Sequence, residues 1–141
     1  MNCDDRLVAG AVAVHLALTL GHGWAHASIP VPYVEWQGVY AGVVLFLAPV
    51  AGLLALVGGR QRLGYWLVLL AGVGGVAFEG LFHFVVHSPD HVASVGNAAG
   101  LFASTAVLTT LGDALLVAVA YWSLRTSTTA SGVRRPRHSG P

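Results

Sequence analysis

The chain has 141 residues, of which 55% are hydrophobic and only 9% carry a charged side chain. An average soluble domain has about 25% charged residues, so this composition excludes a water-soluble bundle, which needs polar outer faces. The length suits one domain, and Cys3, the single cysteine, cannot form an internal disulfide. We therefore expect an integral membrane protein whose main partner is the lipid bilayer.

Four apolar runs are long enough to cross a bilayer as helices, because about 20 helical residues span the hydrocarbon core. They cover residues 7–27, 38–58, 63–86 and 98–124. We interpret the first run as a retained helix rather than a cleaved signal peptide. The sequence thus predicts an all-α fold, a four-helix transmembrane bundle over residues 1–125. Residues 126–141, rich in Ser, Thr, Gly, Pro and Arg, are expected to form a disordered cytoplasmic tail.

The first two runs differ in their polar content. The first carries His15, His22 and His26 on one helix face, because spacings of seven and eleven residues are close to whole helical turns. The second carries no histidine or charged residue, but Pro49 lies midway along it. Since proline has no N–H, it should kink this helix and leave a carbonyl that another group must satisfy.

The third run combines a small-residue face with a row of ionisable residues. Gly72, Gly74 and Gly75 allow close approach of a neighbouring helix, either within the bundle or in a homodimer. Further along, the pattern E-x-x-x-H-x-x-x-H places ionisable residues on roughly one face, and the fourth run adds one aspartate. These residues are Glu79, His83, His87 and Asp113.

The two halves of the chain align without gaps when one is shifted by 61 residues, so that His22 falls on His83 and His26 on His87. Few other residues are identical. Both a repeated helical hairpin and chance similarity between apolar segments therefore fit the alignment. Whatever its origin, the first and third runs cross the membrane in the same direction, which puts both H-x-x-x-H pairs at similar depth.

Arginines orient the bundle. All seven lie before the first run, between the second and third, or after the fourth, and the chain has no lysine. By the positive-inside rule, both termini are expected on the cytoplasmic side of the cell membrane, with the paired histidines near the external face. The tryptophans and tyrosines, Tyr65 among them, lie near the ends of the runs, as in an interfacial aromatic belt.

Ionisable residues within membrane spans are costly and are therefore candidates for function. Histidines four residues apart lie on one helix face, which is suitable ligand spacing for a transition metal. We expect copper or zinc, with iron left open by the carboxylates. In decreasing order the predicted ligands are His22, His26, His83 and His87, then Glu79, then a second layer of His15 and Asp113. Asp90 and His91 are interpreted as solvated loop residues.

Three functions remain open at this level. The first is metal handling by the histidine-rich site. The second is a redox protein with b-type heme, or a metal-dependent enzyme such as a hydrolase, in which Glu79 is a general base beside a water-filled cavity. The third is a non-catalytic or proton-relay subunit of a larger membrane complex. Nucleic-acid binding is disfavoured, because the only basic cluster lies in the short tail.

Overall fold

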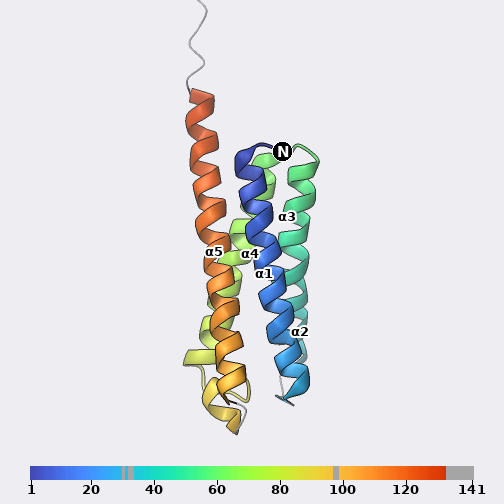
Figure 1. The fold of residues 1–141 in the computed structure, drawn as a ribbon, viewed down its shortest axis with the longest axis vertical. Helices are drawn as coiled ribbons and strands as arrows, with labels where there is room; N and C mark the ends of the chain where they lie inside the picture. The colour runs from blue at the N-terminus through green and yellow to red at the C-terminus, as the bar shows by residue number, and fades with distance from the viewer. Residues whose placement is uncertain (30, 32–33, 97–98, 133–141) are drawn as a thin grey trace, which may run out of the picture.

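The computed structural model describes residues 1–29, 31, 34–96 and 99–132, and this part of the chain is helical without strands (Figure 1). Each run forms one long helix, and two of them contain a π-helical turn. In chain order the elements are α1 (Cys3–Ser28), α2 (Glu35–Tyr40), η1 (Ala41–Leu47), α3 (Ala48–Val57), α4 (Gln61–Gly80), η2 (Leu81–Val85), η3 (Val92–Ser94) and α5 (Ala99–Gly132).

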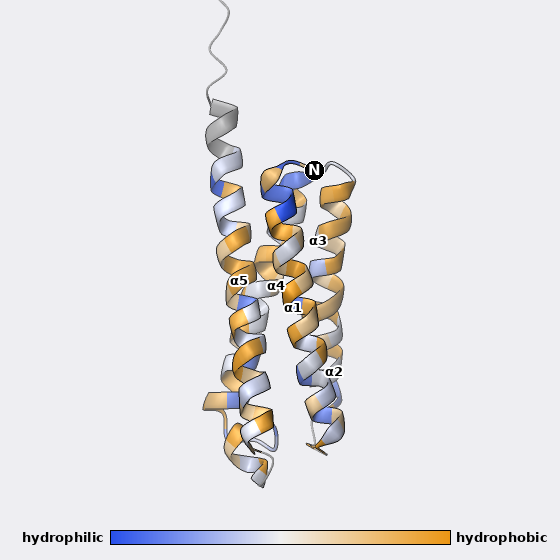
Figure 2. Cartoon of the chain, viewed as in Figure 1, coloured by the Kyte–Doolittle hydropathy of each residue, from blue (hydrophilic) through white to orange (hydrophobic). Residues whose placement is uncertain are grey.

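Four helical segments of the described chain are long and apolar enough to cross a membrane: Cys3–Ser28, Glu35–Val57, Gln61–Val85 and Ala99–Ser127. This confirms the predicted all-α four-helix bundle. Large apolar side chains such as Leu20, Leu54 and Leu70 are more than half exposed, so they face outward from the bundle. Hydrophobic residues occur along all four spans (Figure 2). An apolar exterior suits contact with lipid chains rather than with water.

The order of the helices decides which polar faces can meet. Helix α5 packs along both α1 and α4, and α3 packs along α4. Helices α1 and α4 touch each other little, so they lie diagonally across the bundle with α5 between them (Figure 1). Histidines on α1 and at the end of α4 can therefore meet only through the bundle axis.

The small-residue face of α4 is used inside the chain. A Cβ at Gly72 would lie 2.8 Å from the Asp113 carbonyl oxygen, and one at Gly75 would overlap the Asp113 carboxylate. A Cβ at Gly74 would meet the Tyr40 hydroxyl at 2.9 Å. These glycines thus admit α5 and the second span within the chain.

One end of the bundle carries the chain's N-terminus, the α3–α4 turn and the far end of α5, and we name it the arginine end (Figure 1). Here Asp5 is buried and accepts a 2.7 Å hydrogen bond from the Tyr65 hydroxyl. Tyr65 is fully buried, so its place in an interfacial belt was wrongly predicted. Next to Tyr65, toward the middle of the bundle, Val8, Val12 and Leu116 form a tightly packed apolar core.

Helix α5 extends further than expected. Residues 126–132 are helical, and the hydroxyls of Thr126 and Ser127 both donate to the Ser123 carbonyl. The Thr126 hydroxyl also lies 2.8 Å from the Asp4 carboxylate at the start of α1. These local and tertiary contacts favour the helix, so the predicted tail begins too early. The remainder of that tail, residues 133–141, lies outside the described residues.

Candidate metal centre

Pro49 shapes the surroundings of the innermost histidine. Because Pro49 carries no N–H, it cannot donate to the carbonyl of Leu45, four residues earlier. That carbonyl instead lies 2.8 Å from Nε2 of His15 on α1. The prediction that the freed carbonyl finds another partner is therefore confirmed, and the partner fixes the orientation of the imidazole.

His15 is paired with Asp113, across the α1–α5 interface. The His15 Nδ1 and Asp113 Oδ1 atoms are 3.1 Å apart, and both side chains are almost fully buried. Since Nε2–H donates to the Leu45 carbonyl, Nδ1 and the carboxylate share a single further proton. Asp113 Oδ2 is buried without a hydrogen-bond partner among the described residues. The structure does not bring His15 and Asp113 into the metal-ligating group described below.

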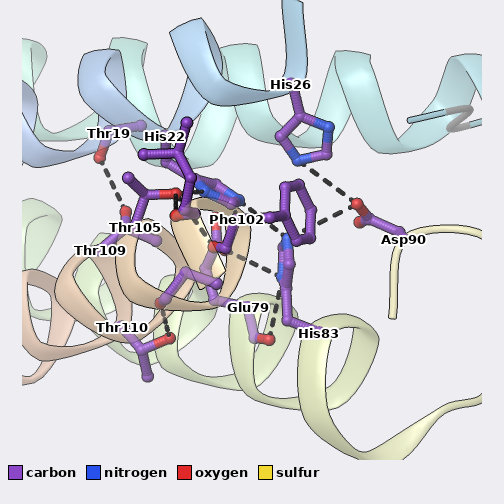
Figure 3. A network of polar contacts seen from close by, with 12 residues as sticks. Thr19, His22, His26, Glu79, His83, Asp90, Phe102, Thr105, Thr109 and Thr110 are labelled. Atoms are coloured by element: carbon purple, nitrogen blue, oxygen red, sulfur yellow. Dashed lines mark hydrogen bonds and ion pairs between the residues drawn. The ribbon is translucent and has the colours of Figure 1, made fainter. Parts of the chain in front are cut away.

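Nearer the other end of the bundle, three imidazoles converge (Figure 3). His22 and His26 come from α1, and His83 comes from η2. One ring nitrogen from each lies within 4.8 Å of the other two. We name this group the histidine cluster and its end of the bundle the histidine end. Three of the four predicted histidine ligands are therefore brought together, through the axis rather than between adjacent helices.

His87 is not part of the histidine cluster. The third span ends at Val85, and Val86 has an extended backbone with ψ of 116°. His87 is therefore outside the helix, exposed, with its ring against His91. The residue before a proline disfavours the α conformation, so Ser88-Pro89 ends the helix nearby. That signal in the sequence argues against the second H-x-x-x-H pair, and the structure does not bring His87 to the other three predicted histidine ligands.

Asp90, rather than His87, lies against the histidine cluster. It lies in the turn after η2, is 3% exposed, and was wrongly interpreted as solvated. Its Oδ1 atom is 3.3 Å from His26 Nε2 and 3.5 Å from His83 Nε2. Burial raises the pKa of Asp90 to about 6. Only the path of the folded connection places this carboxylate at the histidine cluster, and no spacing rule in the sequence predicts it.

Glu79 approaches the histidine cluster from α4, one turn before His83. Its Oε2 atom lies 3.1 Å from His83 Nδ1 and 3.9 Å from His22 Nε2. His83 Nδ1 is also 3.1 Å from Glu79's own backbone carbonyl, which is the better aligned acceptor. Among the described residues, no aligned donor reaches Glu79 Oε2, although this atom is buried. A buried carboxylate oxygen without a donor calls for a ligand, a water or a metal.

The hydrogen-bond partners assign the tautomer of His83. Its Nδ1 atom faces the Glu79 carbonyl, which can only accept, so His83 Nε2 carries a lone pair. The His22 Nδ1 atom lies 2.9 Å from the Thr105 hydroxyl, which can donate to it or accept from it. The Nε2 atoms of His22 and His83 face each other at 2.9 Å, a distance at which a single proton or a metal ion joins them.

The spacing of the donor atoms fits a metal. With metal–nitrogen bonds of about 2.0–2.1 Å, two ligands of a tetrahedral ion lie about 3.3 Å apart. Three separations lie around this value: 2.9 Å for His22–His83, 3.3 Å for His26–Asp90 and 3.5 Å for His83–Asp90. The three imidazole nitrogens together lie within 4.8 Å of one another. The ring of Phe102 packs against all three imidazoles of the histidine cluster and restricts their rotation.

A cavity of about 270 Å³ opens beside the histidine cluster, between α1, the second span and α4. Its polar wall includes Glu79 and Asp90, and its apolar wall includes Leu45, Phe46 and Phe78. The centre is therefore reached from a space large enough for a small molecule or part of a larger one. The sequence shows no sign of this cavity, because it depends on how the helices diverge.

Three imidazoles with two carboxylates in reach form a donor set typical of zinc, copper and iron. Four apolar helices that carry such a histidine cluster are compatible with a membrane metal-binding protein. No protein-family model matches the chain, and no curated protein or solved structure shows significant similarity to it.

Proposed function

We propose that the protein binds one transition-metal ion, zinc or copper, through His22, His26 and His83, with Asp90 as the carboxylate ligand. The observation that carries this proposal is the convergence of three imidazoles, with one ring nitrogen from each within 4.8 Å of the other two. The Nε2 atoms of His22 and His83 are 2.9 Å apart, close enough to bind the same ion. Asp90 Oδ1, which also faces His83 Nε2, supplies negative charge to the same ion.

The donor types narrow the choice of metal. Imidazole and carboxylate ligands suit Zn²⁺ and Cu²⁺, whereas Cu⁺ prefers thiolate or thioether sulfur. Cys3, the single cysteine, and Met1, the single methionine, belong to the opposite end of α1, far along the helix from His22. The site thus favours a divalent ion. A heme fits less well, because imidazoles already in contact leave no gap for a macrocycle between them.

The location of the site suggests its role. If the arginine end faces the cytoplasm, as the positive-inside rule favours, the histidine end opens toward the external side. A metal ion would then be captured from outside, by a small membrane protein with both termini inside. The apolar core around Val8, Val12 and Leu116 offers no polar path onward to the arginine end. Metal capture or use at the histidine end is therefore favoured over transport across the membrane by one copy.

The test is the metal content of the full chain purified in detergent and reconstituted with Zn²⁺ or Cu²⁺. We expect about one equivalent per chain in the wild type, and little in H22A and H83A. Variants H87A and H91A are matched controls, since both remove a histidine from the same end without touching the histidine cluster. Circular dichroism checks that each variant keeps its helices.

Two results would contradict the proposal. Wild-type protein that stays metal-free after reconstitution would leave the His22–His83 contact to be bridged by a proton, as in an imidazole–imidazolium pair. Equal metal content in H22A and H87A would place the ion elsewhere. A Co²⁺-substituted sample adds a direct view of the ligands, because tetrahedral Co²⁺ with nitrogen and oxygen donors absorbs in the visible range.

A further inference from the structure

We propose that the metal centre is hydrolytic, with the adjoining cavity as the site for an acyl ester or amide that carries an apolar chain, and with Glu79 as general base. This inference rests on the proposed metal site. It goes further by assigning a substrate class to the cavity and a role to Glu79, whose carboxylate is not among the proposed metal ligands.

The cavity is kept open by small residues on two facing helices. Gly23 of α1 and Gly42 of η1 both line it, and a Cβ at either position would meet nothing within 4 Å. The space of about 270 Å³ is therefore not closed by the packing of α1 against the second span.

The walls of the cavity indicate an amphiphilic occupant. Leu45, Phe46 and Phe78 offer an apolar surface, while the histidine cluster, Glu79 and Asp90 form the polar end. Among the described residues no arginine lines the cavity, and the chain has no lysine, so a phosphate or a sulfate would find no cationic side chain there. An uncharged carbonyl group at the metal, with its apolar chain along the phenylalanines, fits both walls.

Glu79 is suitably placed for proton transfer. Its Oε2 atom is 3.9 Å from His22 Nε2, and a metal ion lies about 2 Å from its nitrogen ligands. A water molecule between the ion and Glu79 would therefore be within hydrogen-bond reach of the carboxylate. The same atom is buried and lines the cavity without an aligned donor among the described residues. A metal beside a carboxylate base and a cavity is the arrangement of metal-dependent hydrolases.

The reaction balances without any further reactant. A metal ion at the histidine cluster would polarise the acyl carbonyl and the water. As the water oxygen bonds to the acyl carbon, Glu79 accepts one proton from it. The bond from that carbon to the alcohol oxygen or amine nitrogen then breaks, and Glu79 returns the proton to the departing atom. One water is consumed, a carboxylic acid and an alcohol or amine are released, and no electrons are exchanged.

The experiment uses the zinc-reconstituted full chain in detergent micelles, with 4-nitrophenyl octanoate and 4-nitrophenyl acetate as probes. Metal content is measured on every sample. We expect E79Q to keep its metal and lose about 100-fold or more in kcat, the typical effect of removing a general base. G42L, which fills the cavity, should lose activity toward octanoate more than toward acetate, again with metal retained.

Two controls exclude trivial causes. V43L changes the outward-facing neighbour of Gly42 and should behave as wild type. The H87A/H91A double variant removes an exposed and a half-buried imidazole, which can cleave activated esters without a site, and should also keep its activity.

The outcomes separate the two proposals. A wild type that holds metal but shows no metal-dependent turnover, or an E79Q variant as active as wild type, overturns the hydrolytic role and leaves the metal site standing. Loss of metal from E79Q would make Glu79 a ligand, which also overturns its role as base. A wild type without metal overturns both.

Discussion

The Nε2 atoms of His22 and His83 lie 2.9 Å apart, although α1 and α4 are diagonal members of the bundle. The contact is made across the axis because both side chains project inward at the same depth. The far nitrogen of each ring has its own hydrogen-bond partner, the Thr105 hydroxyl for His22 and the Glu79 carbonyl for His83. The two Nε2 atoms are therefore left to face each other, and this relationship underlies the predictions below.

Replacing Asp90 should weaken metal binding. Loss of its carboxylate removes one ligand and the negative charge that faces His26 and His83. We expect D90A to bind zinc at least 10-fold more weakly than wild type, measured by competition with a chromophoric chelator. The exposed H87A variant serves as the control and should keep wild-type affinity. An unchanged affinity in D90A would show that the carboxylate is not a ligand.

Removing the hydrogen bond behind His22 should also weaken binding. T105V keeps the shape of the side chain but cannot form a hydrogen bond with His22 Nδ1, so the ring is no longer held in its orientation. We expect a 10–100-fold loss in zinc affinity by the same competition assay. T110V is the matched control, since the Thr110 hydroxyl donates to the Ala106 carbonyl of its own helix. Equal losses in the two variants would indicate a general effect on α5 instead.

The His15–Asp113 pair should contribute to stability rather than to metal binding. D113A leaves His15 without its buried partner, which typically costs about 3–5 kcal/mol. We expect a lower unfolding midpoint in detergent, with the metal stoichiometry of the folded protein unchanged. In a double-mutant cycle, H15A and D113A should be non-additive, because each removes the same interaction. Additive effects, or loss of metal from folded D113A, would contradict this assignment.

A methyl group at Gly75 should disrupt the packing of α5 on α4. The new Cβ would overlap the Asp113 carboxylate, so either the helices separate or the His15 pair breaks. We expect G75A to be destabilised by about 1–3 kcal/mol, the usual cost of overpacking. G10A is the control on α1, where a Cβ meets nothing within 4 Å and alanine favours the helix. Thermal unfolding in the same detergent compares the two.

Some of this architecture could be predicted from the sequence because it depends on local properties. Hydropathy and length indicate four spans, since a bilayer imposes both on any helix that crosses it. Helical periodicity places His15 and His22 on the buried face of α1, and both are buried. The missing N–H of Pro49 predicts a carbonyl nearby that needs another partner. In the structure this is the Leu45 carbonyl, and its partner is His15.

Only the tertiary structure decided which side chains of other helices the polar faces of α1 and α4 contact. Helix periodicity says nothing about the order of helices around an axis, so the diagonal contact of His22 with His83 could not be predicted. The helix ends before Val86, so His87 lies away from the histidine cluster, whereas Asp90 in the following turn lies against it. The path of this turn depends on the packing of the helices at both of its ends. The spacing of residues along the chain specifies which face of one helix each side chain is on. A metal site and its cavity depend instead on the distances between side chains of different helices.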